Sequence, residues 1–241
     1  MTLQDVIDKR KSFRKYTNQP VEQELLDRIK EFVAAAKPLY PEIRVRMEYI
    51  SRENVKCIQT WIPQQFIAIY SEEKDGYLEN AGFIFQQVDL FLQFVGLGSC
   101  WLGLGKPEEK VKEKQSDGMK FVILLAFGYS SESLREGADE FKRNALTEIS
   151  DQEDERLECV RIAPSSVNSQ PWYFTHEGEL LHAYCSKQGF LKARVLGDLN
   201  RIDMGIGLAH LYVKHQETFE FTQKEQAAQI KNHVYIGSVR I

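Results

Sequence analysis

A short basic segment near the amino terminus has the composition of a phosphate-binding site. Residues 9–15 include five basic side chains, and Ser12 lies between Arg10 and Lys11 on one side and Arg14 on the other. A guanidinium group can donate two parallel hydrogen bonds to a phosphate, and a serine hydroxyl adds a further donor. Charged runs are more often solvated surface, but this one belongs to a chain whose net charge is −4. The segment therefore favours binding of a single phosphate group.

A loop in the second half of the chain combines residue types that can hold a heterocyclic ring. It runs from Pro164 to Trp172 with the sequence PSSVNSQPW. Amide side chains donate and accept hydrogen bonds at a ring edge, and proline restricts the backbone. Each residue type is also common in ordinary loops, but the combination favours a binding function. The candidate ligand contacts are Pro164, Ser165, Ser166, Asn168 and Gln170.

A glycine-rich segment at 96–105, with the sequence GLGSCWLGLG, could let backbone N–H groups approach a flat ligand. It follows a predicted helix and not a strand, so it is not a dinucleotide-binding fingerprint. The structural alternative is the end of a helix followed by a tight turn. Alone, this segment gives weak support for a binding site.

Cysteine and histidine residues indicate neither a metal site nor a nucleophile. The cysteines have no CxxC or CxxH spacing, and the histidines are not spaced for joint metal binding. Cys100 has no basic sequence neighbour that would lower the pKa of its thiol. We therefore predict no metal ligand and no catalytic residue, and keep a hydrolase that uses Cys100 as an alternative.

The elements that must position these residues mix helices with non-adjacent strands. A capping box at Thr2 and Asp5 predicts a first short helix. Helical spacing and end signals predict further helices at 25–36, at 77–96, starting at Pro107, at 153–162 and at 201–216. Apolar patterns predict strands at 43–49, 66–70, 120–129, on either side of Glu177–Gly178 and twice after residue 216. The polar, acidic residues 130–154 are the predicted linker. This order of elements indicates a layered α+β fold.

The composition of the 241 residues is that of an ordinary globular protein, with 43% hydrophobic and 27% charged residues. A net charge of −4 argues against a binder of nucleic acid or of an anionic membrane. The longest apolar run, Phe121–Phe127, is much shorter than the ~20 residues that cross a bilayer. Charges near the amino terminus argue against a secretion signal, so we expect a cytoplasmic protein with reduced thiols.

Together, the three segments resemble those of the FMN-dependent nitroreductase family. In this family a helix ends in an RxSxR phosphate motif, matched by RKSFR at 10–14, and a PSSxNxQPW loop is matched at 164–172. A buried helix ending in Gly-Leu-Gly is matched at 96–98. The resemblance implies a layered α+β fold with a central mixed sheet flanked by helices, and FMN as cofactor. It assigns the phosphate to Arg10, Lys11, Ser12, Arg14 and Arg143, the ring and ribityl chain to Pro164, Ser165, Ser166, Asn168 and Gln170, and the flavin N5 to the backbone of Leu102 and Gly103.

One departure from the family pattern concerns the position of the loop. In most members it follows the second helix, where this chain has Ala36–Pro41 without the asparagine and glutamine. The sequence is similar to a branch in which one chain combines two half-like units. This resemblance implies an internally duplicated pseudo-dimer, with halves at 1–150 and 151–241 packed as one unit, one FMN per chain and possible function as a monomer. The phrases QVDL at 87–90 and RIDM at 201–204 give weak support for duplication.

The implied activity is a ping-pong transfer of electrons from NAD(P)H through FMN to a nitroaromatic, quinone or other small acceptor. FMN carries this chemistry, so the protein needs no nucleophile or dedicated base. The alternative from a different class is an FMN-binding carrier or sensor with little turnover.

Overall fold

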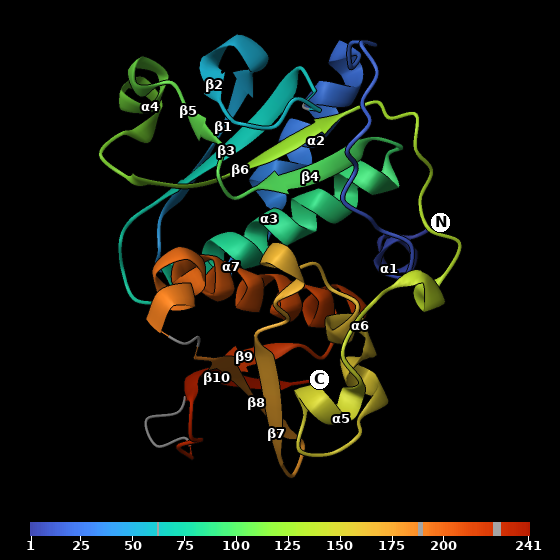
Figure 1. Cartoon of the computed structure of the whole chain (residues 1–241), viewed down its shortest axis with the longest axis vertical. Coiled ribbons are helices and arrows are strands. Elements are labelled where there is room, and N and C mark those ends of the chain that lie inside the picture. Colours follow the sequence, from blue (N-terminus) through green and yellow to red (C-terminus); the bar gives the residue numbers. More distant parts are fainter. Residues whose placement is uncertain (62, 188–189, 224–227) are drawn as a thin grey trace.

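Two four-stranded sheets enclose a layer of helices in the computed structural model (Figure 1). The structure describes residues 1–61, 63–187, 190–223 and 228–241, with the backbone alone for 190–195. The first sheet has the order β1–β3–β6–β4, formed by Val45–Ser51, Gln65–Ser71, Lys120–Gly128 and Gly98–Leu102. The second has the order β7–β8–β10–β9, formed by Trp172–Glu177, Leu180–Ser186, His233–Arg240 and Glu220–Thr222. Between them lie the two long helices, α3 (Tyr77–Phe94) and α7 (Phe190–Lys214).

Shorter elements complete the described part of the chain. The remaining helices are α1 (Leu3–Ile7), α2 (Gln23–Ala35), α4 (Glu109–Ser116), α5 (Leu146–Ile149) and α6 (Glu158–Arg161). Two short strands, β2 (Val55–Lys56) and β5 (Lys106–Pro107), pair in a separate ladder. Single 3₁₀ turns occur at 52–54, 138–140, 155–157 and 166–168. No helix among the described residues combines the length and the hydrophobicity needed to span a bilayer.

Side chains that alternate along β3 give the first sheet two apolar faces. Ile67 and Ile69 belong to the large core that includes α3, whereas Phe66 and Ala68 belong to a smaller core on the opposite face. Both faces are buried, which explains why the strand is a continuous apolar run. Strand β4 is held in this buried sheet because it pairs antiparallel with β6.

Helices α3 and α7 cross in direct backbone contact at two glycines. A Cβ atom added to Gly82 would lie 2.0 Å from the carbonyl oxygen of Ile202, and one added to Gly205 would lie 2.0 Å from the carbonyl oxygen of Glu79. Each glycine therefore contacts the residue three positions before the other glycine. Only glycine permits this approach, because any side chain would overlap with the opposite backbone. The reciprocal contacts give the crossing local two-fold symmetry.

Most predicted elements are confirmed, and the layered α+β arrangement is present. Thr2 and Asp5 form both hydrogen bonds of the capping box at α1. The sheets differ from the expectation of one mixed sheet flanked by helices, because every described strand pair within them is antiparallel and the long helices lie between the sheets. Apolar strands such as β3 are typical of parallel sheets, but here α4 and the β2–β5 ladder cover the outer face of an antiparallel one.

Three local predictions are wrong. Residues 98–102 form strand β4 and not a turn, because Trp101 and its apolar neighbours pair with β6. Pro107 belongs to strand β5, and α4 begins only after it. Helix α7 begins at Phe190, well before residue 201. Gly197 lowers the helix propensity of the residues before 201, but α7 continues through Gly197.

The segment 130–154, predicted as a linker, is anchored along its length. The Ser130 hydroxyl donates to the carbonyl oxygen of Lys15, and the Arg135 N–H donates to that of Lys9. Phe141 and Ile149 are buried in the main core. The contacts with the amino-terminal segment place residues 130–135 beside the basic motif, which the polar composition alone did not indicate.

The crossing predicts a large difference between two glycines of the same helix. Gly205→Ala should lower the free energy of unfolding by about 3 kcal/mol or more, because the added methyl group overlaps with α3 backbone atoms. Gly197→Ala is the matched control, since its added Cβ meets no described atom within 4 Å. It should be neutral or stabilising by up to ~1 kcal/mol. Urea denaturation of both variants measures the difference, and equal effects would contradict the assigned role of the crossing.

Candidate functional site

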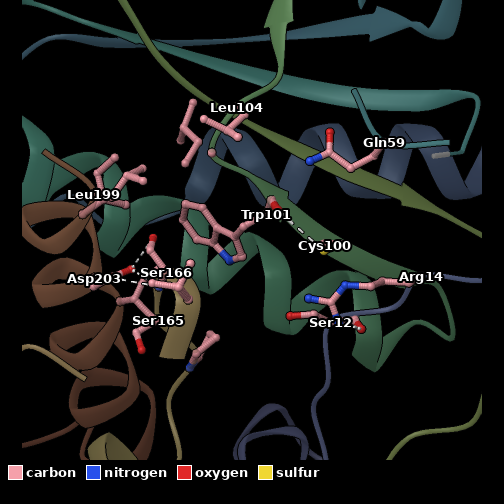
Figure 2. A pocket seen from close by; sticks show the side chains of 16 residues that line it. Ser12, Arg14, Gln59, Cys100, Trp101, Leu104, Ser165, Ser166, Leu199 and Asp203 are labelled. Carbon is pink, nitrogen blue, oxygen red and sulfur yellow. Dashed lines mark hydrogen bonds between the residues drawn. The ribbon is translucent and has the colours of Figure 1, made fainter. Parts of the chain in front are cut away.

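A cavity of about 220 Å³ lies where segments from both halves of the chain meet (Figure 2). The amino-terminal basic segment, the end of β4, the loop from Pro164 and the middle of α7 build its wall. The lining side chains include Ser12, Arg14, Cys100, Trp101, Gly103, Leu104, Pro164, Ser165, Ser166, Val167, Leu199 and Asp203. The structure therefore brings the three segments singled out by sequence together within one chain.

A buried ion pair fixes the basic segment beside this cavity. Arg10 is 1% exposed, and its Nε lies 3.1 Å from Oδ2 of Asp89 on α3. Asp89 also accepts hydrogen bonds from Gln86, Gln93 and Ser99. The Nη2 atom of Arg10 is buried and has no hydrogen-bond partner within the described part of the chain. Arg10 thus anchors the segment to α3 and still has one unused donor.

Two further arginines lie beside Arg10, around the ring of Phe141. The guanidinium carbons of Arg135 and Arg143 lie 4.2 and 5.5 Å from the ring centroid, and Arg135 donates a hydrogen bond to the carbonyl oxygen of Arg10. Burial and the charge of Arg10 lower the pKa of Arg135, and they lower the pKa of Arg143 to about 10. We call Arg10, Arg135 and Arg143 the arginine cluster. Arg10 is buried and Arg135 and Arg143 are half-buried, so these like charges favour binding of an anion.

The other predicted phosphate ligands differ in their availability. Ser12 and Arg14 line the cavity. The Arg14 guanidinium lies 5.6 Å from the ring centroid of Trp61 and has no carboxylate partner among the described residues. Lys11, in contrast, pairs with Glu132, with Nζ and Oε1 3.1 Å apart. Lys11 is therefore less available to a phosphate than the sequence indicated, because a carboxylate already balances its charge.

A buried carboxylate holds the loop of residues 164–171. Asp203 on α7 is 1% exposed and accepts hydrogen bonds from the backbone N–H and the hydroxyl of Ser166 and from the hydroxyl of Ser169. Figure 2 shows Asp203 and Ser166 joined in this way at the cavity wall. Burial raises the pKa of Asp203 to about 7, although these hydrogen bonds oppose the shift. The cavity therefore has an acid in its wall that titrates near neutrality.

Two predicted ring contacts, Asn168 and Gln170, are directed elsewhere. The Asn168 side chain accepts a hydrogen bond from Arg143 Nη1 and donates one to the carbonyl oxygen of Lys142. Gln170 accepts from the backbone N–H of Asn144. Both side chains tie the loop to residues 142–144 and are not among the lining residues of the cavity. They support the loop, whereas Pro164, Ser165 and Ser166 form its cavity face.

The end of β4 contributes one predicted residue and one that was not predicted. Gly103 lines the cavity, whereas the Leu102 side chain is buried in the smaller core on the other face of the sheet, so only its backbone remains a candidate contact. Trp101 also lines the cavity, and in Figure 2 its indole lies between the serine side and the arginine side. Burial raises the pKa of the Cys100 thiol to about 11, which opposes a role as a nucleophile.

Sequence reasoning missed Arg135 and Asp203. Arg135 lies in the segment interpreted as a linker, where a single arginine carries no signal. Asp203 was considered only as part of a repeated phrase, although an acid within the apolar pattern of α7 was a usable sign of a buried polar role. The described histidines form no metal site with neighbouring cysteines or acids, and His210 is fully buried, with its pKa lowered to about 3.

The raised pKa of Asp203 predicts a pH dependence of stability. Its ordinary value of 3.8 rises to about 7 on folding, so the contribution of the protonated form is present at low pH and is lost as the pH rises from about 4 to about 7. Asp203→Asn removes this titration and keeps an oxygen that can accept from Ser166. The wild type should therefore lose stability relative to Asp203→Asn over this pH range. Urea unfolding at pH 4.5 and 7.5 tests this, and parallel pH profiles would refute it.

A family profile identifies the family of the chain, and a solved structure shows its fold. The profile of the family described as "Putative TM nitroreductase" matches residues 2–215. A solved structure from Thermotoga maritima, described as a "putative nitroreductase", is 18% identical and has a TM-score of 0.66. The match covers 99% of this chain and 92% of that one. This likeness shows the shared fold. No curated protein matches the chain.

Two solved structures from Clostridium difficile are similar to part of the chain. A nitroreductase family protein from strain 630 is 20% identical over 62% of this chain and 96% of that one, with a TM-score of 0.49. A protein described as an FMN-dependent nitroreductase, from strain R20291, is 21% identical over 54% of this chain and 88% of that one, with a TM-score of 0.44. Because the family profile spans nearly the whole chain, the protein belongs to the nitroreductase family that this profile describes.

Proposed function

We propose that the protein is an FMN-dependent oxidoreductase that takes electrons from NAD(P)H and reduces a small nitroaromatic, quinone or related acceptor. The observation that carries the proposal is the arginine cluster, which adjoins the cavity through Ser12 and through the residue before Pro164. Arg143 donates to the carbonyl oxygen of Ala163, so the cluster is tied to the loop itself. A cationic end and a partly apolar cavity suit a ligand with one phosphate and a flat ring.

The arginine cluster fits the phosphate end of FMN on chemical grounds. A phosphate monoester carries close to two negative charges near neutral pH and has three acceptor oxygens. The unpartnered Nη2 of Arg10 supplies a donor to such a group. Arg135 and Arg143 add positive charge beside it, and the Arg143 nitrogens already donate to backbone carbonyls and to Asn168. Ser12 and Arg14 supply further donors at the cavity wall. Bound phosphate would thus offset the repulsion among these partly buried like charges.

The remaining residues of the cavity would hold and shield the ring. Pro164, Ser165 and Ser166 present one proline and two hydroxyls, and the absence of a side chain at Gly103 lets the backbone approach. When bound, FMN supplies hydride acceptance from the nicotinamide and electron transfer to the acceptor. The chain itself positions the reactants and excludes water, so no nucleophile is required. Asn168 and Gln170 contribute by keeping the loop in place.

A further part of the proposal is that the chain contains two related halves and binds one FMN. Asp203 lies two residues before the crossing glycine Gly205, and Asn80 lies two residues before Gly82. Asn80 Oδ1 accepts from the backbone N–H groups of Leu39 and Tyr40, just as Asp203 accepts from the loop in the second half. The Pro38–Pro41 segment is therefore the counterpart of the Pro164 loop. Figure 1 shows the two sheets on opposite sides of the crossing.

The phrase shared by the long helices is not part of this correspondence. Asp89 lies seven residues after Gly82, whereas Asp203 lies two before Gly205, so the two aspartates do not occupy equivalent positions. The similarity of QVDL and RIDM is therefore no sign of duplication. The glycines and the side chains that bind the loops carry that argument instead.

The counterpart position in the first half is filled by side chains. Tyr40 is 6% exposed, and its ring lies so close to Gly76 that an added Cβ would meet it at 2.7 Å. The same ring makes an edge contact with Phe221, with centroids 5.3 Å apart. Beside it, Arg201 forms an ion pair with the buried Glu79. A second FMN would have to displace this packed group, which supports one FMN per chain.

The cofactor proposal predicts a yellow protein whose chromophore is FMN. Arg14→Ala should weaken FMN binding by about 1.5–3 kcal/mol, the range for hydrogen bonds to charged groups. Lys15→Ala is the matched control, because this neighbouring basic residue is exposed and does not line the cavity. Mass spectrometry identifies the chromophore, and titration of apoprotein with FMN gives the dissociation constants. Release of FAD or of no flavin would exclude the proposal.

Addition of NAD(P)H without oxygen separates an enzyme from a carrier. An oxidoreductase should lose the visible absorbance of its oxidised flavin and regain it through many cycles when a quinone is added. Reduction by dithionite alone would favour the carrier or sensor. Cys100→Ala should leave this cycle intact, and complete loss of activity with flavin still bound would support a thiol mechanism.

The single-chain site predicts that two defective variants cannot complement each other. Arg14→Ala and Asn168→Ala remove contributions from different halves, because Arg14 lies in the half at 1–150 and Asn168, which keeps the loop in place, lies in the half at 151–241. Because both come from one chain, refolding the two variants together should restore no FMN binding beyond that of each alone. A mixture of wild type with either variant serves as control and should bind FMN in proportion to the wild-type chain. Recovery in the variant mixture would show that the site is shared between chains.

A further inference from the structure

The loop at the cavity contains a valine in a left-handed backbone conformation. Val167 has φ 49° and ψ 26°, and Asn168 and Gln170 also have positive φ values, of 58° and 46°. Asparagine adopts this region readily, but a β-branched residue does so only at a cost in free energy. Glycine or asparagine would be the expected residue at position 167. The presence of valine therefore needs a reason outside the backbone.

Buried partners on both sides hold Val167 in this conformation. Asp203 binds the N–H of Ser166 and the hydroxyl of Ser169, which flank it in the chain. Arg143 binds the side chain of Asn168. Such strain persists where surrounding contacts determine the backbone, and it occurs often at functional sites. The loop thus fixes the direction of the valine side chain before any ligand arrives.

The Val167 side chain is also the most exposed of the large hydrophobic side chains described. It is 81% exposed, and Leu104 is 65% exposed, yet both residues line the cavity of Figure 2. An exposed valine in a strained conformation stabilises nothing in the free protein. Exposed apolar residues at a cavity are typical of a ligand-contact surface.

Only two charged side chains are among the described residues that line the cavity. They are Arg14, which we assign to the phosphate end, and Asp203, whose carboxylate is occupied by Ser166 and Ser169. The described lining residues include no other charged side chain. We propose that Val167, together with Leu104, is a specificity-determining residue that contacts an apolar face of an uncharged electron acceptor. This inference rests on the proposed function and adds the residues that select the acceptor.

Val167→Asn tests the inference because it should raise the thermal stability of the protein and lower its affinity for the acceptor. The left-handed conformation suits asparagine, so the variant should unfold about 2–4 °C higher than wild type. Loss of the apolar contact should weaken binding of menadione, a neutral quinone, about 10-fold, which corresponds to about 1.4 kcal/mol. Quenching of tryptophan fluorescence by menadione measures its binding, and Trp101 in the cavity wall is a suitable reporter. FMN titration of both proteins is measured alongside, because Val167 also lines the cavity assigned to FMN. A loss of FMN binding as large as the loss of menadione binding would overturn the inference.

Val234→Asn is the matched control, because Val234 is 40% exposed on β10 and does not line the cavity. It should leave menadione binding unchanged. Ferricyanide, a small and highly charged acceptor that needs no apolar contact, should be reduced equally by wild type and Val167→Asn. Unchanged menadione binding in Val167→Asn would overturn the inference, as would an equal loss for both quinone and ferricyanide. Failure to bind FMN would refute the proposed function alone, since menadione quenching can be measured without flavin.

Discussion

The contact between α3 and α7 at Gly82 and Gly205 is the constraint on which the rest of the structure depends. A methyl group at either position would overlap with a carbonyl oxygen of the other helix, so the separation of the helices is set by two residues without side chains. That separation places Asp203 beneath one loop and Asn80 beneath the other. The two sheets pack outward from this layer, and the cavity lies where its edge meets β4 and the amino-terminal segment.

Electrostatics then distinguishes the two sides of the crossing. Near the cavity, Asp89 is the buried acid that balances Arg10, and its oxygens are shared with Gln86, Gln93 and Ser99. Arg143 has other arginines as its charged neighbours, which together with burial lowers its pKa. Like charges that are partly buried repel one another more strongly than they would in water. In the proposed function, a bound phosphate would offset this repulsion.

Local signals predicted much of the fold and part of the site. The Thr2–Asp5 capping box and the apolar strand at 66–70 depend on neighbouring residues, and both were predicted. The basic motif and the PSSVNSQPW loop were recognised by composition, but the direction of Asn168 and Gln170 depends on residues 142–144 and could not be read from the loop. Arg135 escaped notice for the same reason, since its role arises from contacts across the fold. The antiparallel pairing of two-sided apolar strands likewise depends on what covers their outer face.

The different side chains at Asn80 and Asp203 have a consequence for how such a protein can change. In a symmetric assembly of identical chains, every substitution occurs at all equivalent positions at once. Here the two loop-binding side chains lie at separate positions of one chain, so a substitution on one side leaves the other untouched. Tyr40 can fill one side while Ser166 remains open to a cavity on the other. With the two halves that we propose, a single chain can thus devote one half to stability and release the other for chemical diversification.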